Sequence, residues 1–181
     1  MILSHNGKFR VLEFYAKKSG CKACVEVGTY QGDMTSKLAQ ILRPVVTIEL
    51  DLKLWQKANE VFAGTHIICV LGSGESCLLQ ALGMCHGDRA LVYLDGHYSG
   101  EGTACGAEPE PAVTELELLY TWLLKWPGSI GAIVIDDVRC FGTEPGFPRK
   151  STLLSAAEKF EPLGFELSIE DDQLILVKEA A

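Results

Sequence analysis

The sequence has no cluster of basic residues, and acidic residues outnumber basic ones. It contains 16 Lys and Arg against 24 Asp and Glu, for a formal net charge of −8 at pH 7. Nucleic acids and anionic membrane surfaces attract basic patches. The charge balance therefore argues against both as main partners and favours a small-molecule ligand.

Long apolar runs are also missing. Stretches such as Ile130 to Ile135 are far shorter than the roughly 20 residues that a membrane-spanning helix needs. The opening Met-Ile-Leu-Ser-His-Asn-Gly lacks the basic start and the apolar centre of a signal peptide. We expect a cytoplasmic protein with no membrane partner.

The seven cysteines do not form a recognisable disulfide framework, because their number is odd and no secretory signal precedes them. Cys24 and Cys69 lie in apolar runs, where a free thiol behaves as a small hydrophobic side chain. Cys21-Lys22-Ala23-Cys24 has the CxxC spacing, but a zinc site of this kind needs a second pair. We expect reduced cysteines that pack in the core.

The chain does contain a regular alternation of short apolar runs and segments of helical period. This alternation is typical of a parallel sheet with helices on both faces. Strands are expected at 24–27, 45–49, 67–70, 90–94 and 130–135, followed by an antiparallel hairpin at 165–169 and 174–177. Helices are expected at 8–18, 35–42, 52–62, 77–84, 112–124 and 153–160. The prediction is one α/β domain over residues 1–181, with a doubly wound, mostly parallel seven-stranded sheet and an N-terminal helix within residues 1–20.

Residues 96–111 interrupt the alternation. The segment is rich in Gly, has no apolar period and is long for a connection inside an α/β unit. Long loops in compact domains often carry function. We expect this loop to act as a lid that excludes water from the ligand.

In doubly wound sheets, ligands bind beyond the carboxyl ends of the strands. The first strand leads into the turn Glu26-Val27-Gly28-Thr29-Tyr30-Gln31-Gly32, and glycine there permits positive φ and close approach of a ligand. Glu49 ends the second strand, about twenty residues after Gly28, which is the spacing at which an acidic side chain accepts hydrogen bonds from a ribose. A dinucleotide fingerprint would have Gly in place of Tyr30, so the turn indicates an adenosine ligand without a pyrophosphate.

This turn resembles motif I of the class I S-adenosylmethionine-dependent methyltransferases, whose pattern is E/D-x-G-x-x-x-G, and the resemblance covers nearly the whole chain. It implies an S-adenosylmethionine-dependent methyltransferase of EC 2.1.1 type, in which Glu49 binds the ribose hydroxyls. Ser73 takes the place where many relatives have an acidic residue near the adenine. The resemblance assigns these residues to the cofactor site: Glu26, Gly28, Thr29, Tyr30, Gly32, Glu49, Ser73 and Asp95.

Three acidic residues follow the fourth and fifth strands: Asp95, Asp136 and Asp137. If these strands are neighbours, their ends lie about 5 Å apart, and proton uptake or a bound cation would relieve the crowding of the carboxylates. The arrangement resembles the metal-dependent O-methyltransferases of the catechol, caffeoyl-coenzyme A and macrolide-sugar types, which implies that all three bind Mg²⁺ or another divalent cation. Side chains alternate along a strand, so one of the last two could instead cap a turn.

The same resemblance implies methyl transfer to the oxygen of a small-molecule hydroxyl, with Asp95 or His97 as the base that takes the proton. The phrase Leu94-Asp95-Gly96-His97-Tyr98-Ser99-Gly100 is similar to one found in a small, mostly uncharacterised group of this superfamily. Few residues precede the first strand, so acceptor contacts are expected from 96–111, from 141–147 or from the second subunit of a homodimer.

Two alternatives stay open from the sequence. An NAD- or nucleotide-binding oxidoreductase would share Gly28 and Glu49, although the chain has no convincing Tyr-x-x-x-Lys. A non-catalytic S-adenosylmethionine-binding protein would share the whole cofactor site, because a fold and a ligand site do not prove activity.

Overall fold

The computed structural model describes residues 5–97, 106 and 110–180. Its strands are β1 (Ala23–Val27), β2 (Val45–Glu49), β3 (Ile67–Leu71), β4 (Ala90–Leu94), β5 (Ile130–Ile135), β6 (Glu166–Glu170) and β7 (Gln173–Val177). They form one seven-stranded sheet in the order β3-β2-β1-β4-β5-β7-β6. β1 to β5 are parallel, and β7 runs antiparallel to both β5 and β6. The predicted doubly wound sheet with a C-terminal antiparallel hairpin is confirmed.

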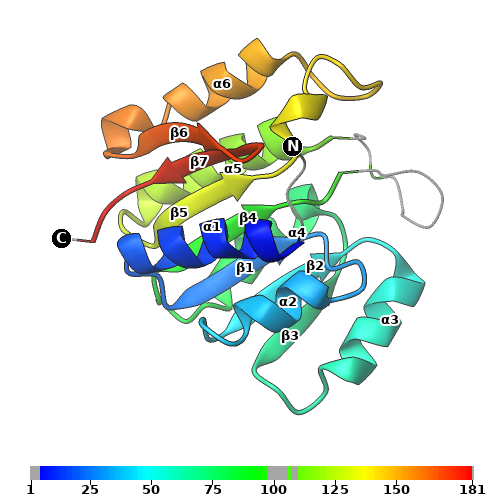
Figure 1. The fold of residues 1–181 in the computed structure, drawn as a ribbon. Coiled ribbons are helices and arrows are strands. Elements are labelled where there is room, and N and C mark those ends of the chain that lie inside the picture. Colours follow the sequence, from blue (N-terminus) through cyan, green and yellow to red (C-terminus); the bar gives the residue numbers. More distant parts are fainter. Residues whose placement is uncertain (1–4, 98–105, 107–109, 181) are drawn as a thin grey trace.

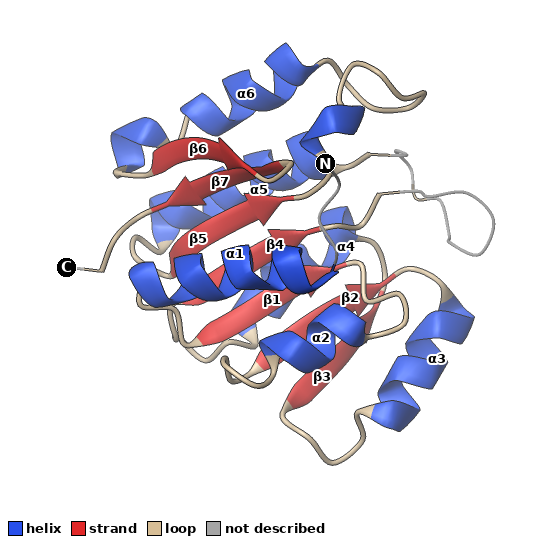
Figure 2. Ribbon diagram, viewed as in Figure 1, coloured by secondary structure: helices blue, strands red, loops and turns tan. Residues whose placement is uncertain are grey.

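Within the described residues, six α-helices cover the sheet (Figures 1 and 2). They are α1 (His5–Lys18), α2 (Asp33–Leu38), α3 (Leu52–Val61), α4 (Gly74–Gly83), α5 (Ala112–Lys125) and α6 (Lys150–Glu158), with two short 3₁₀ turns at Val138–Cys140 and Glu161–Leu163. α1 and α2 pack on one face of the sheet, and α4, α5 and α6 pack on the other. α3 contacts β2 and β3 at the edge of the sheet.

The central strands are buried on both faces, which explains their nearly continuous apolar sequence. In β1, Val25 and Val27 point into the core under α4 and α5, whereas Cys24 points into the core under α1 and α2. Successive side chains of a strand face opposite sides. One apolar run therefore supplies both cores.

All six helices lie where they were predicted, but α1, α2, α4 and α6 differ from their predicted bounds by two or more residues. α1 begins at His5 rather than at residue 8, and α6 spans Lys150–Glu158 rather than 153–160. The helix expected at 35–42 ends at Leu38, where the chain tightens into a turn in which the Ile41 amide donates to the Leu38 carbonyl. The helix expected from Cys77 begins at Gly74, because its first turn contains no apolar side chain to mark it. All of these differences lie at helix ends, where the apolar period carries no signal.

The strand order reverses beside β1. The chain passes from β1 to β2 and β3 on one side, then returns to place β4 and β5 on the other. The carboxyl ends of β1 and β4 are therefore neighbours, with Val27 opposite Leu94. Such a switch point opens a crevice in which doubly wound proteins bind ligands.

Three further predictions concern the chain as a whole. Most of the expected lid at 96–111 lies outside the described residues, which omit 98–105 and 107–109. The six cysteines in the described ranges are free, and Cys21 and Cys24 are both buried. None of the helices described is long and apolar enough to cross a membrane.

Candidate active site

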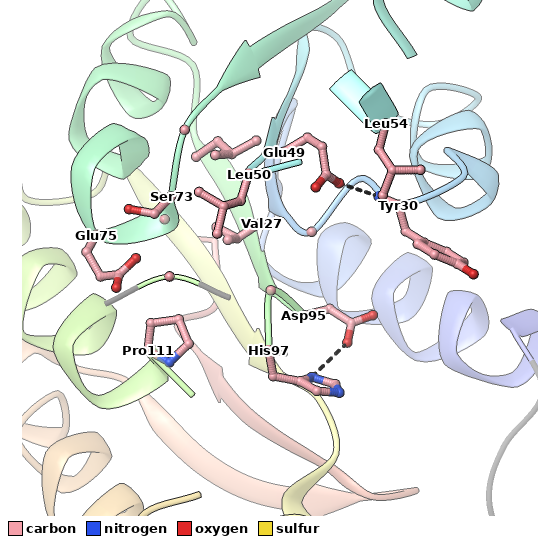
Figure 3. A pocket seen from close by; sticks show the side chains of 16 residues that line it. Val27, Tyr30, Glu49, Leu50, Leu54, Ser73, Glu75, Asp95, His97 and Pro111 are labelled. Carbon is pink, nitrogen blue, oxygen red and sulfur yellow. Dashed lines mark hydrogen bonds and ion pairs between the residues drawn. The ribbon is translucent and has the colours of Figure 1, made fainter. Parts of the chain in front are cut away.

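A cavity of about 350 Å³ lies at the switch point (Figure 3). Residues that follow β1, β2, β3 and β4 form its walls, so its lining comes from four separate turns at one edge of the sheet. Five of the residues predicted to hold a cofactor line this cavity: Gly28, Tyr30, Glu49, Ser73 and Asp95. His97, predicted as a base, lines it as well.

The Glu49 carboxylate is fixed at the cavity wall by backbone amides. The Tyr30 amide donates to Oε2 at 2.7 Å (Figure 3). The Asp51 amide donates to Oε1 at 2.9 Å. Two such bonds leave lone pairs free, because a carboxylate accepts about four hydrogen bonds. Glu49 can therefore accept hydrogen bonds from the hydroxyls of a ligand without moving.

Gly28 allows the β1 and β4 turns to meet. Its φ is +95°, in the left-handed region, and a β-carbon there would lie 2.3 Å from the carbonyl oxygen of Asp95. Only glycine fits both the backbone conformation and the available space. The glycine therefore permits the contact between the two turns, and its backbone also lines the cavity.

Glu26, Thr29 and Gly32 are not among the residues that line the cavity. Glu26 is fully buried, and its Oε2 accepts hydrogen bonds from Thr35 at 2.5 Å and Thr47 at 2.7 Å. Its Oε1 has no partner within the described structure, and burial raises the pKa of this carboxyl to about 7. Thr29 shares a 2.6 Å hydrogen bond with Thr47. The structure places these side chains behind the turn that forms the cavity wall, where they hold it in position.

The wall beneath β3 contains a second buried carboxyl. Ser73 precedes α4 and faces the cavity, with its hydroxyl 3.1 Å from that of Ser76. Glu115 of α5 packs under Gly74, where a β-carbon would clash with its Oε1. That oxygen has no partner in the part of the chain described, and burial raises the pKa of Glu115 to about 8. The sequence does not mark Glu115 as a site residue, because an acidic side chain in the first turn of a helix is ordinary.

The acidic residues after β4 and β5 lie together as predicted, because these strands are neighbours with Leu94 opposite Ile135. The Tyr93 hydroxyl lies between them, 2.5 Å from Asp136 Oδ2 and 3.0 Å from Asp95 Oδ2. Burial and the neighbouring Asp136 carboxylate raise the pKa of Asp95 well above its usual value. Asp95 and Asp136 therefore oppose each other's ionisation.

Asp137 reaches the cluster because β5 has already ended. Its backbone is left-handed, with φ of +53°, and it precedes the 3₁₀ turn Val138–Cys140. The alternation of side chains along a strand does not apply there, so Asp136 and Asp137 turn toward the same side. The Arg139 guanidinium donates to Asp137 Oδ1 at 2.7 Å and also pairs with Asp172.

Lys8 of α1, which sequence reasoning missed, lies between the two carboxylates that follow β5. Its Nζ is 2.6 Å from Asp136 Oδ2 and 3.3 Å from Asp137 Oδ1. Burial lowers the pKa of Lys8, but the hydrogen bond and charge of Asp136 outweigh that effect and raise it. The lysine therefore stays charged. Nothing local in the sequence marks Lys8, since its partners are more than a hundred residues away.

His97 lies between Asp95 and Asp137. Its Nδ1 is 3.7 Å from Asp95 Oδ1, and its Nε2 is 3.4 Å from Asp137 Oδ2. The imidazole also packs against the ring of Phe147, with centroids 5.4 Å apart. Burial lowers the pKa of His97. The ring is thus held by contacts on two sides and by an aromatic neighbour.

Of the three carboxylates expected to bind magnesium, Asp95 and Asp137 belong to a group that could hold a metal ion, and Asp136 does not. Asp136 already accepts three of the about four hydrogen bonds that a carboxylate can accept, because Oδ1 accepts from the Asp137 amide at 2.8 Å and Oδ2 accepts from Lys8 and Tyr93. Among the described residues, the group that brings three ligand atoms within 4.8 Å of one another is Asp95, His97 and Asp137. This set includes a nitrogen, whereas Mg²⁺ prefers oxygen ligands, and the Lys8 ammonium lies against it.

No family model matches the sequence, and no curated protein is similar to it. Solved structures do match. An O-methyltransferase from Bacillus cereus in complex with SAH has a TM-score of 0.57 at 17% identity over 95% of this chain and 81% of that chain. A putative caffeoyl-CoA O-methyltransferase from Staphylococcus aureus matches with a TM-score of 0.56 at 15% identity, over 98% of this chain and 85% of that chain. The 23S rRNA methyltransferase ErmE matches with a TM-score of 0.51 at 15% identity, over 99% of this chain and 70% of that chain.

The strand order and the cavity at its switch point define a Rossmann-like α/β protein. Within that class, the matched structures show that this chain has the fold of the class I S-adenosylmethionine-dependent methyltransferases. The neighbours differ in the acceptors that their names state, so the acceptor must be inferred from the site.

Proposed function

We propose that this protein is an S-adenosylmethionine-dependent methyltransferase that acts on the oxygen of a small-molecule hydroxyl. The observation that carries the proposal is the Glu49 carboxylate, held by two backbone amides at the wall of the switch-point cavity. A neighbour of the same fold binds SAH, the demethylated form of the cofactor. A carboxylate fixed in this way can accept hydrogen bonds from the ribose hydroxyls of an adenosine ligand.

Each part of the cavity has a role in binding the cofactor. Glu49 accepts hydrogen bonds from the two ribose hydroxyls, and the backbone at Gly28 lies against the methionine part. Leu50 and Leu54 supply apolar surface, and Ser73 offers a hydroxyl near the adenine end. S-adenosylmethionine would supply a methyl group activated by a positively charged sulfur.

Two features disfavour NAD as the ligand. Tyr30 occupies the place where a dinucleotide site needs bare backbone, and its side chain lines the cavity. Asp33 lies in the first turn of α2, where its negative charge opposes a pyrophosphate at the helix N-terminus. The oxidoreductase alternative is thus the weaker one.

His97 is proposed to take the proton from the acceptor hydroxyl. Asp137 lies beside Nε2 and accepts the proton of that nitrogen, which leaves Nδ1 as the acceptor on the side of Asp95 and the cavity. The acceptor oxygen forms a bond to the methyl carbon, the bond from that carbon to sulfur breaks, and the hydroxyl proton moves to Nδ1. The magnesium assistance implied by the resemblance is not part of this proposal, because Lys8 and Tyr93 already bind Asp136.

The proposed acceptor is a small molecule rather than a nucleic acid, although ErmE shares the fold. A net charge of −8 repels a polyanion. A homodimer and a cytoplasmic location both remain predictions. Light scattering of the purified protein and fractionation of its host cells would check them.

The proposal is tested by incubating the protein with S-adenosylmethionine labelled on its methyl group and a panel of phenols, sugars and matched amines. Wild-type protein is expected to label a hydroxyl compound. His97→Asn is expected to lower kcat by about 10²- to 10⁴-fold, which is the usual contribution of general-base catalysis, while affinity for S-adenosylhomocysteine stays within about threefold.

His86→Asn is the matched control, because His86 is exposed in a turn with φ of +54°, a conformation that Asn tolerates. Its turnover should equal that of wild type. Labelling of the amines alone, or equal loss of turnover in both variants, would contradict the proposed reaction.

A further inference from the structure

Lys8 occupies a central position in the acidic cluster. Its Nζ lies 2.6 Å from Asp136 Oδ2 and 3.3 Å from Asp137 Oδ1. The side chain is only 12% exposed, and that of Asp136 is fully buried. α1 packs against β5 and places its N-terminal end at the edge where β4 and β5 finish (Figure 1). A helix from the start of the chain thus brings an ammonium group to the carboxylates.

A positive charge at this point does what a cation would do. Buried carboxylates that crowd together need compensation by proton or cation. Here Lys8 and Arg139 both contact Asp137, and Lys8 shares Asp136 with the Tyr93 hydroxyl. The oxygens of Asp136 are all hydrogen-bonded, since Oδ1 accepts from the Asp137 amide. The protein compensates the cluster with its own side chains.

We propose that the ammonium of Lys8 takes the place of the divalent cation, so that the acidic cluster functions without a metal ion. The proposal rests on the proposed function, since the resemblance to metal-dependent O-methyltransferases is what implies a cation at this place. It concerns a positioning residue: Lys8 holds Asp136 and Asp137, and Asp137 in turn holds His97.

A divalent ion bound by Asp95, His97 and Asp137 is the competing arrangement, since these offer ligand atoms within 4.8 Å of one another. Such an ion would share Asp137 with two cationic side chains, Lys8 and Arg139. Repulsion between like charges a few ångströms apart in a partly buried site opposes this. The two arrangements predict opposite responses to metal ions.

Thermal unfolding of the full-length protein distinguishes them, with Mg²⁺ or Mn²⁺ as the probe and EDTA as the reference. The variant Lys8→Met keeps an unbranched stem and removes the charge. Lys17→Met is its matched control, because Lys17 lies on the same helix in an exposed pair with Glu13. Lys8→Arg keeps the charge and should behave as wild type.

Wild type, Lys17→Met and Lys8→Arg are expected to unfold at the same temperature with metal or EDTA. Lys8→Met is expected to unfold at a lower temperature in EDTA. It should gain about 5–10 °C at a metal concentration a hundred times the dissociation constant of the vacated site. The response should disappear in Lys8→Met/Asp136→Asn, which lacks one carboxylate of that site.

Stabilisation of wild type by Mn²⁺ that EDTA reverses would overturn the proposal. An unfolding temperature of Lys8→Met that neither Mg²⁺ nor Mn²⁺ changes would also overturn it. If Lys8→Met does not fold, equilibrium dialysis of wild type against Mn²⁺ tests the proposal instead. One bound ion per chain would contradict the proposal, and the absence of bound ion would support it. Neither measurement involves an acceptor or S-adenosylmethionine. A negative result therefore stays separate from failure of the proposed function.

Discussion

Among the residues that line the cavity, Glu49 is the one on which we expect cofactor binding to depend most. It is held by the Tyr30 and Asp51 amides, and hydrogen bonds to a charged group contribute about 1.5–3 kcal/mol each. We expect Glu49→Gln to weaken binding of S-adenosylhomocysteine by about 10- to 100-fold. Calorimetric titration measures this change. Glu60→Gln, at an exposed site on α3, should bind as wild type, and equal affinity in both variants would exclude Glu49 from the site.

Gly28 tests whether the contact between the β1 and β4 turns is needed. Gly28→Ala combines a positive φ with a clash against the Asp95 carbonyl, so it should lower the free energy of unfolding by more than the roughly 1–3 kcal/mol of backbone strain alone. Gly64→Ala is the control, since its φ is +76° and a β-carbon there meets nothing within 4 Å. Urea unfolding compares the two, and equal losses would show that the close approach has no energetic consequence.

Which site residues could be predicted depends on whether their signal is local. Gly28 and Glu49 follow strands at a characteristic spacing, and both line the cavity. Glu26 belongs to the same motif, but its position within β1 turns it away from the cavity toward Thr35 and Thr47. Lys8 was missed because its only signal is a contact across 128 positions of sequence.

Among the secondary-structure elements, β2, β4 and β5 have the bounds that were predicted, because each is an apolar run between polar or Gly-containing turns. Such a strand is marked at both ends by its own composition. The ends of α1, α2, α4 and α6 were misplaced, since the apolar period does not mark where a helix begins or ends. The lid expected at 96–111 stays a prediction, because most of that segment lies outside the described residues.

The packing of α5 against α4 should depend on pH through Glu115. Burial raises its pKa to about 8 from an ordinary value of 4.5. Between these values the folded state keeps a proton that the unfolded state releases, so the stability of the wild type falls as pH rises from about 5 to about 8 and then levels off. Glu115→Gln has no such proton, and its stability should fall less over this window, by an amount on the order of a few kcal/mol.

Urea unfolding of both proteins at several pH values checks this prediction. Glu117→Gln lies two positions along the same helix at an exposed site, and its stability should follow that of wild type. Burial also raises the pKa of Glu26 and that of Glu110, which lies just before α5, each to about 7. Both residues are present in every variant, so the difference between the curves reports on Glu115. Parallel curves for wild type and Glu115→Gln would contradict a buried, protonated Glu115.

At the scale of the whole molecule, the strand order explains why distant turns form one site. Parallel strands end at the same edge, and reversal of the order beside β1 sets the β1, β2, β3 and β4 turns around one cavity. This arrangement was predictable because alternating apolar and helical segments admit few topologies. The acceptor was not predictable, because structures with this fold include both a putative caffeoyl-CoA O-methyltransferase and a 23S rRNA methyltransferase.

The central claim is that the switch-point cavity binds S-adenosylmethionine. It is tested most directly by calorimetric titration of the wild-type protein with S-adenosylhomocysteine and, separately, with NAD⁺. We predict one molecule of S-adenosylhomocysteine bound per chain, with no measurable heat from NAD⁺. Binding of NAD⁺ alone, or of neither ligand to a folded sample, would contradict the claim.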